Sequence, residues 1–426
     1  MIGETVSAIA GPMLVGGESL VKVNGESVLV ANAVPGDELT IHISGRRRGV
    51  YRGEIVELIK AAEDRITPPC PVADHCGGCA LQSLSGDKQA ELKSVWVKQA
   101  FASLMHADSD WQPVQFHEER FRRRVRWHVG SDSEGQFLGF YAFASHQPVR
   151  HMQCMVVTPA LNAARVLIEK CVSLKGIEAV QALQLVDGMH LILETKRGFK
   201  AIEEAIKEPT EVADIEGLPL QWWWRDQQGI TRPLKKPVVP FHDSLPAGKS
   251  DVSLSVGPDG FVQGQLEGNR ELIAQIQAWA GKPRRIADLF CGIGNLSLPL
   301  AAATGAEIVG AELNAASVRA ASANAKAVGV KASFAEANLF DNFDIEPYIG
   351  ADLLLLDPPR RGAKRICSQI SRLLPKQIIM ISCDAAAGAR DGQLLKEHGY
   401  RLKALRALDL FPGAGHVEAM TYWMRS

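Results

Sequence analysis

The stretch Ile286-Ala-Asp-Leu-Phe-Cys-Gly-Ile-Gly-Asn295 decides the fold of the C-terminal third of the chain. Its first residues are apolar and predict a buried strand, and a loop containing Gly292 and Gly294 follows before the next apolar run. The glycines let the backbone approach a ligand closely, but the loop lacks the third glycine of the dinucleotide fingerprint. We therefore predict a small-molecule site at the carboxyl edge of an open sheet.

Outward from this loop, strand-like and helix-like segments alternate through residues 286–426. This alternation predicts a doubly wound α/β sheet. The expected strands are 286–290, 307–311, 331–335, 352–356, 377–382, 401–408 and 417–424.

Polar residues stand where several of these strands end. Glu312 ends the second strand, where a carboxylate can accept hydrogen bonds from both hydroxyls of a ribose. Asn338 follows the third strand and is placed to contact an adenine. The turn Asp357-Pro-Pro-Arg360 ends the fourth, and its prolines stiffen the backbone that carries the carboxylate. Such a loop and acid look like the S-adenosylmethionine site of class I methyltransferases.

A cysteine ends the next strand, in Ile378-Ile-Met-Ile-Ser-Cys383. A thiol packed in a core is the commoner fate of a cysteine, but Cys383 lies at the edge where ligands bind. One reaction that needs a thiol at such an edge is the methylation of uracil at C5. Uracil C5 is too poor a nucleophile to take a methyl group unless a thiolate first adds at C6. The C5 proton must then go to a base on another element, and Glu418 on the last strand is the candidate.

Three cysteines lie within a loop broken by prolines and glycines. They form the pattern Cys70-x5-Cys76-x2-Cys79, and Cys154 is a fourth candidate further along. Closely spaced thiolates repel one another unless a cation lies between them, so the spacing favours a metal. Zinc and an iron-sulfur cluster both suit four sulfur ligands, and the solitary fourth cysteine favours the cluster.

The remaining N-terminal sequence suggests RNA-binding elements. Residues 1–60 hold short apolar runs separated by glycine-rich turns, which predicts a small β-barrel of the OB type. The segment Phe121-Arg-Arg-Arg-Val-Arg-Trp-His predicts a strand with Arg122, Arg124 and Arg126 on one face. That face suits a phosphate backbone, although a salt-bridged sheet surface is the alternative. The run Gln221-Trp-Trp-Trp-Arg225 predicts a packed strand.

Composition sets broad limits on the class of protein. A chain of 426 residues with 46% hydrophobic residues can bury a large core. No basic segment precedes the apolar residues of the N-terminus, and the longest apolar run is too short to span a bilayer. We expect a cytoplasmic protein without a membrane partner or an evident obligate protein partner. The net charge of -1 means that any RNA surface must be local.

Taken together, these motifs resemble the RNA uracil-C5 methyltransferase family, and most closely its 23S rRNA branch. The resemblance implies a TRAM β-barrel over residues 1–62, a central α+β iron-sulfur and RNA-binding domain over 63–258, and a class I (Rossmann-like) methyltransferase domain over 259–426. It implies formation of 5-methyluridine in 23S rRNA, of the m5U1939 type, with S-adenosyl-L-methionine and a [4Fe-4S] cluster as cofactors.

The resemblance also implies roles for single residues. Cys383 would be the nucleophile and Glu418 the base, while the Arg122 to Arg126 strand would contact RNA. The cluster would be held by Cys70, Cys76, Cys79 and Cys154. The methyl donor would be held by Gln263 of a Phe-x-Gln element and by Phe290, Gly292, Gly294, Asn295, Glu312, Asn338 and Asp357.

Three positions depart from the family pattern. Gln265 replaces the asparagine of Phe-x-Gln-x-Asn, Asp384-Ala385 replaces the Asn-Pro after the nucleophile, and Asp-Pro-Pro-Arg replaces Asp-Pro-Ala-Arg. We expect a negative charge at Asp384 to raise the pKa of the neighbouring thiol. The alternatives are a tRNA or other rRNA uridine as target, an amino-group methyltransferase that uses Asp357, and a non-catalytic RNA-binding iron-sulfur protein.

Overall fold

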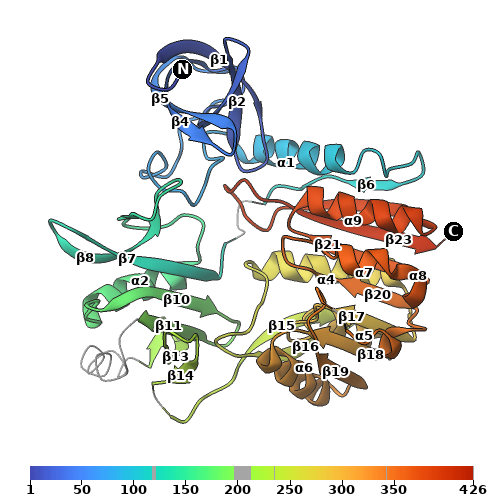
Figure 1. The fold of residues 1–426 in the computed structure, drawn as a ribbon. Coiled ribbons are helices and arrows are strands. Elements are labelled where there is room, and N and C mark those ends of the chain that lie inside the picture. Colours follow the sequence, from blue (N-terminus) through green and yellow to red (C-terminus); the bar gives the residue numbers. More distant parts are fainter. Residues whose placement is uncertain (118–120, 196–212, 235, 342, 426) are drawn as a thin grey trace.

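A computed structural model describes the chain from Met1 to Arg425, except for residues 118–120, 196–212, 235 and 342. In Figure 1 a small barrel (blue) lies at one end of the molecule, above α1 and the C-terminal strands. The barrel closes in the strand order β1-β2-β3-β5-β4, which confirms the predicted N-terminal barrel. Its strands are β1 (Thr5–Met13), β2 (Glu18–Val23), β3 (Glu26–Ala31), β4 (Glu38–Arg47) and β5 (Val50–Lys60).

A mixed sheet in the order β12-β13-β11-β10-β7-β8-β9 forms the centre of the chain, with β14 paired to β13. Trp222 and Trp224 of β13 are buried in its core, and Trp223 on the other face donates its indole N–H to His190 Nδ1 at 2.9 Å. The tryptophan run is therefore a packed strand, as predicted. The elements are β7 (Arg124–Asp132), β8 (Gly135–Tyr141), β9 (Pro148–Val149), α2 (Pro159–Cys171), β10 (Ile177–Gln184), β11 (Met189–Thr195), β12 (Asp214–Ile215), β13 (Leu218–Arg225) and β14 (Thr231–Pro233).

The C-terminal sheet has the order β19-β18-β17-β20-β21-β23-β22-β6. Strands β19, β18, β17, β20 and β21 run parallel, and β23 is antiparallel to both of its neighbours. The strands are β17 (Arg285–Leu289), β18 (Glu307–Glu312), β19 (Ala332–Glu336), β20 (Leu353–Leu356), β21 (Gln377–Ser382), β22 (Tyr400–Leu408) and β23 (Glu418–Arg425).

Helices cover both faces of this sheet because its strands are apolar on both sides. Leu353 and Leu355 of β20 join the core beneath α4, α5 and α6, whereas Leu354 and Leu356 join the core that contains α1 and α9. This confirms the doubly wound class I arrangement. The helices are α4 (Leu266–Ala280), α5 (Ser297–Thr304), α6 (Ala315–Val328), the short 3-10 helix η2 (Glu346–Tyr348), α7 (Lys364–Ser368), α8 (Ile370–Leu373) and α9 (Ala385–Glu397).

Two segments from the expected central region pack on the methyltransferase sheet instead. Strand β6 (Asp110–Gln112) pairs with β22, and α1 (Gly86–Ala100) packs against α9 and β22. The hairpin of β15 (Phe241–Ala247) and β16 (Ser250–Val256) packs on α4, α5 and α6. Residues of the expected central region therefore contribute to the hydrophobic cores on both faces of the C-terminal sheet. The pattern along the chain does not reveal such distant partners.

Among the described residues, no helix combines the length and the apolar character needed to cross a bilayer.

Candidate active site

Four polar side chains line the carboxyl edge of the C-terminal sheet on neighbouring strands. Asp288 lies on β17, Asp357 follows β20, Cys383 follows β21 and Glu418 begins β23. Strands β21 and β23 are antiparallel, and their last registered pair is Ser382 opposite Ala419, so the next residues, Cys383 and Glu418, lie across from each other. The edge thus brings the predicted nucleophile and base together.

The three carboxyl groups at this edge are poorly solvated. Burial raises the pKa of Asp357 to about 7, with a further contribution from Asp288, whose own pKa burial raises to about 7. Burial and then Asp357 raise the pKa of Glu418 to about 8, while Arg360 opposes the shift. A positive charge placed beside these groups would favour their ionised forms, and so the edge suits a cationic ligand.

The Cys383 thiol is half-buried, and burial is the first reason that its pKa rises to about 11. Glu418 and then Asp357 add to the rise, whereas Arg360 lowers it. The groups with the largest effects on this pKa do not include Asp384, whose carboxylate caps α9 by accepting from Ala387 N at 2.9 Å, so the expected effect of Asp384 stays a prediction. A carboxylate at that position also interacts favourably with the positive N-terminal end of the helix dipole.

Sequence reasoning missed an arginine that acts on the thiol and the histidine to which it is hydrogen-bonded. Arg360 Nη2 lies 3.1 Å from His416 Nε2, and Arg360 favours the ionised forms of both Cys383 and Glu418. Burial and the nearby Arg360 charge lower the pKa of His416. Both residues belong to motifs that the sequence made visible, the Asp-Pro-Pro-Arg turn and the segment before Glu418, and only their neighbours were singled out.

The glycine loop has the backbone conformation that a close ligand requires. Gly292 and Gly294 have φ angles of +54° and +84°, and Phe290, with φ 71°, adopts a left-handed conformation unusual for a bulky residue. A Cβ at Gly292 would meet nothing within 4 Å, so the loop faces open space there. Glu312 Oε2 accepts from Gly292 N at 3.2 Å. These groups fit an S-adenosylmethionine site.

Other predicted cofactor residues are engaged with protein groups. Gln263 Nε2 donates to Asp357 Oδ2 at 3.4 Å, which ties the Phe-x-Gln element to the fourth-strand turn. Asn295 exchanges two amide hydrogen bonds of 2.9 Å with Asn269. The Asn338 amide bonds within its own turn, accepting from Phe340 N at 3.1 Å. Direct contacts of Asn295 and Asn338 with a cofactor stay predictions.

An aromatic cluster beside the glycine loop was not predicted. The Phe290 and Phe340 ring centroids lie 5.3 Å apart, and the Arg361 guanidinium lies 3.1 Å from the Phe340 centroid. The sequence does not indicate this cluster, because its members come from separate segments. Phe340 belongs to the segment after β19 and Arg361 to the turn after β20.

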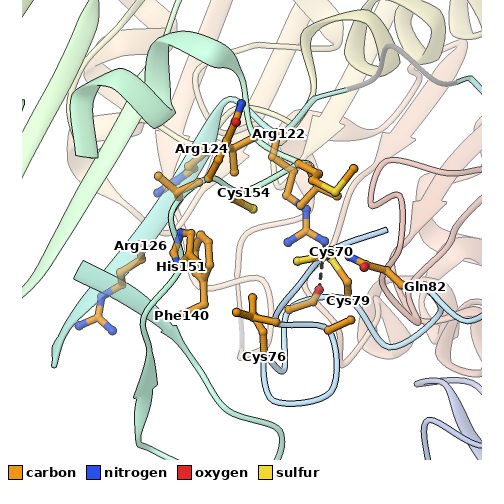
Figure 2. Close-up of a pocket in the computed structure, with 18 residues that line it drawn as sticks. Cys70, Cys76, Cys79, Gln82, Arg122, Arg124, Arg126, Phe140, His151 and Cys154 are labelled. Carbon is orange, nitrogen blue, oxygen red and sulfur yellow. Dashed lines mark hydrogen bonds between the residues drawn. The ribbon is translucent and has the colours of Figure 1, made fainter. Parts of the chain in front are cut away.

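The four cysteines predicted to hold a metal line one cavity of about 250 Å³. In Figure 2 the labelled residues Cys70, Cys76, Cys79 and Cys154 lie around this cavity. Backbone N–H groups of Gly78 and Val156 bond to the Cys76 and Cys154 sulfurs, but burial raises the pKa of Cys76 and raises that of Cys154 to about 11.

Burial thus favours the neutral thiols of Cys76 and Cys154 unless a cation enters. Over the described chain no three cysteine, histidine, aspartate or glutamate side chains are already gathered tightly enough to form a metal-binding group. The all-thiol donor set, the shared cavity and the N–H donors nonetheless fit an iron-sulfur cluster.

The three predicted RNA-binding arginines lie on one face of β7 or just before it. Arg122 donates to Gly78 O at 3.4 Å beside the cysteine cavity, and Arg124 lies over the Phe261 ring at 5.7 Å. Arg126 pairs with Glu194 at 2.6 Å, so a salt-bridged sheet surface accounts for part of this face.

Comparisons with known proteins agree with this geometry. Residues 258–377 match the family described as Methyltransferase small domain. The chain also has the same fold as the tRNA (uracil-54, C5)-methyltransferase of Pyrococcus abyssi, solved with S-adenosyl-L-homocysteine. The TM-score is 0.77 at 19% identity, and the match covers 98% of this chain and 99% of that one.

Curated relatives cover nearly the whole chain. The 23S rRNA (uracil(1939)-C(5))-methyltransferase RlmD of Shewanella sediminis is 31% identical over 414 residues, which is 95% of this chain and 92% of the relative. The RlmD protein of Shewanella sp. strain MR-4 is 32% identical over 417 residues, with the same coverage of 95% and 92%. The chain belongs to the RNA uracil-C5 methyltransferase family, in the branch that contains RlmD.

Proposed function

We propose that this S-adenosylmethionine-dependent RNA uracil-C5 methyltransferase acts on 23S rRNA, at a uridine of the U1939 type, through a covalent adduct of Cys383 with uracil C6. The observation that carries the proposal is the placement of Cys383 and Glu418 across from each other on β21 and β23. The target is supported by relatives that are named for uracil 1939 and that match 95% of this chain.

In the first step the Cys383 thiolate adds to C6 of the uracil, and the electron pair of the C5–C6 bond moves onto C5 and O4 as an enolate. Arg360 favours the thiolate, because it opposes the effects of burial and the neighbouring carboxylates on the pKa of Cys383. Bound S-adenosylmethionine would supply an electrophilic methyl group to the C5 carbon, with its S–CH3 bond broken and S-adenosylhomocysteine as the leaving group.

In the second step Glu418 removes the C5 proton, the C5–C6 double bond re-forms and the Cys383 sulfur leaves as a thiolate. A raised pKa of about 8 makes the ionised Glu418 carboxylate a stronger base than an ordinary carboxylate, provided that it is ionised when the substrate is bound. The sulfonium charge of the cofactor would favour ionised Asp357 and Glu418 before reaction.

The cofactor residues are assigned from the same edge of the sheet. We place the ribose of the cofactor against Glu312 and its methionine part along Gly292 and Gly294. We place its methyl group near Gln263 and Asp357. Phe290 lies beside the glycine loop as part of this pocket. The main support is the open space at Gly292 together with the buried carboxyls.

Deletion of the gene is expected to remove one 5-methyluridine from 23S rRNA and to leave the 5-methyluridine of tRNA in place. Mass spectrometry of nuclease fragments from both RNAs measures this directly. A plasmid carrying the wild-type chain should restore the mark. Intact rRNA methylation with loss of the tRNA mark would move the activity to the tRNA alternative.

We also propose that Cys70, Cys76, Cys79 and Cys154 hold a [4Fe-4S] cluster that shapes the loop before α1, and that Arg122, Arg124 and Arg126 contribute to RNA binding. The cluster supplies a compact anionic centre held by four thiolates. Arg122, which lies beside the cavity, favours the thiolate forms of Cys76 and Cys154.

Protein purified without oxygen is expected to contain iron and acid-labile sulfide and to absorb broadly in the visible region. Cys79→Ser should lose most of the iron and lower the melting temperature, because one ligand of the loop is gone. Cys171→Ser, a change at a free thiol in α2, serves as the control and should keep both. Stoichiometric zinc in place of iron would refute the cluster and favour a four-sulfur zinc site.

A further inference from the structure

The loop between β22 and β23, residues 409–417, is buried along most of its length although it has no regular structure. Leu410 is fully buried, and Ala414 is only 6% exposed. A buried loop needs partners for its backbone polar groups, which water cannot reach. The loop leads directly into Glu418, so its position sets that of the proposed base.

Elements from the N-terminal quarter of the chain supply those partners. Leu81 N donates to Gly413 O at 2.9 Å, and Gly413 N donates to Gln89 Oε1 at 3.0 Å. From the barrel, Gly16 N donates to Gly415 O at 3.0 Å. A Cβ at Gly415 would lie 2.3 Å from the carbonyl carbon of Gly16, so the two backbones touch where no side chain fits.

The strongest attachment is an ion pair from α1. Lys93 Nζ lies 2.6 Å from Asp409 Oδ2 and donates to Phe411 O at 3.0 Å, and its side chain is fully buried. The other Asp409 oxygen accepts from Phe411 N at 2.9 Å. A buried ion pair seldom stabilises a protein more than apolar residues of the same size would, but it does specify one arrangement of the groups that it joins.

The far end of the loop reaches the catalytic side chains. His416 bonds to Arg360, and its ring lies edge-on to Phe411 with centroids 6.1 Å apart. Arg360 in turn favours the ionised forms of Cys383 and Glu418. A shift of the loop would therefore move the proposed base and the cation together, away from the thiol.

We propose that Lys93 is a positioning residue for methyl transfer: its ion pair with Asp409 ties α1 to the β22–β23 loop and thereby holds Glu418 and Arg360 around Cys383. This inference rests on the proposed role of Glu418 as the base. Lys93 itself touches neither substrate nor cofactor, and acts only through the loop.

The test uses the full chain with Lys93→Met and Asp409→Asn together. The double change removes both charges, and the asparagine oxygen can still accept from Phe411 N. We expect an unchanged or higher melting temperature and unchanged affinity for S-adenosylmethionine. We expect kcat to fall about 100-fold, the loss typical of a displacement of about 1 Å at a reacting group, with the KM for RNA unchanged. Because adduct breakdown would be slowed, the covalent RNA–protein complex should accumulate with ordinary uridine.

Matched variants make the outcome decisive. Arg165→Met with Glu169→Gln removes a partly buried ion pair within α2, with an N to O distance of 2.6 Å, and should leave kcat unchanged. Gln89→Leu removes a separate anchor of the loop, should give the same signature, and carries the test if the double variant does not fold. An unchanged kcat in a folded double variant, or a loss confined to KM, overturns the inference. Absence of accumulated adduct in Glu418→Gln as well would instead overturn the proposed role of Glu418.

Discussion

Replacing Cys383 by alanine is expected to lower methyl transfer to RNA by roughly four to six orders of magnitude, as removal of a covalent nucleophile does in other enzymes. Without the thiolate, uracil C5 never becomes a nucleophilic enolate carbon, and no other group at this sheet edge can replace the sulfur. The affinity for S-adenosylmethionine should stay the same, because the thiol ends β21 and the cofactor loop follows β17.

Transfer of a radiolabelled methyl group to a 23S rRNA fragment measures the rate, and calorimetry measures cofactor affinity. RNA that carries 5-fluorouridine adds a second readout, since fluorine cannot leave as a proton does and the adduct remains trapped on a denaturing gel. The wild type should give a shifted band and Cys383→Ala none, while Cys171→Ala should behave like the wild type. Substantial activity in Cys383→Ala would instead favour amino-group methylation through Asp357.

Replacing Glu418 by glutamine is expected to slow turnover by about 10²- to 10⁴-fold, the usual contribution of a positioned base. The adduct with Cys383 should still form and accept the methyl group, but the C5 proton would have no acceptor. The covalent complex should therefore accumulate on ordinary RNA, where the wild type shows almost none. Glu397→Gln, a change at an exposed carboxylate of α9, is the matched control.

The difference in melting temperature between Glu418→Gln and the wild type should depend on pH. The folded state raises the pKa of Glu418 from its ordinary value of 4.5 to about 8. A raised pKa means that the folded chain holds this proton more tightly than the unfolded chain, so the stabilisation is complete below pH 4.5 and is lost as the pH rises through 8. Glu418→Gln should therefore melt at a higher temperature than the wild type at pH 9 and at nearly the same temperature at pH 4. A melting temperature of Glu418→Gln below that of the wild type at pH 9 would contradict a raised pKa of the buried Glu418 carboxyl.

Much of the C-terminal half could be predicted from the sequence because its signals are local. The expected strand at 377–382 is β21, and the ends of the other strands differ by a residue or so, because continuous apolar runs between turn residues mark buried parallel strands. Glu312, Asp357 and Cys383 could be placed at one edge for the same reason. Each of them stands at the carboxyl end of a strand that can be recognised from the sequence.

What could not be predicted depends on contacts between distant segments. Nothing in residues 110–112 indicates that they form a strand paired with β22, and nothing in Lys93 alone indicates a partner at Asp409. The sequence places Asp384 beside the thiol but does not show that its carboxylate accepts from Ala387 N. It also does not show that the charges with the largest effects on the Cys383 thiol come from β23 and from the turn after β20. Chain proximity was a poor guide to proximity in space.

The pairing of β6 with β22 also has a consequence for how the chain is made. Ser109, beside β6, donates to the carbonyl of Leu402 in β22, which is 293 residues away. At typical rates of translation, β6 and the apolar face of α1 emerge from the ribosome roughly 15 to 60 seconds before the strands that cover them. The segment from α1 to β6 therefore stays uncovered until almost the last codon has been read, which makes a chain interrupted before β22 a ready substrate for chaperones and proteases.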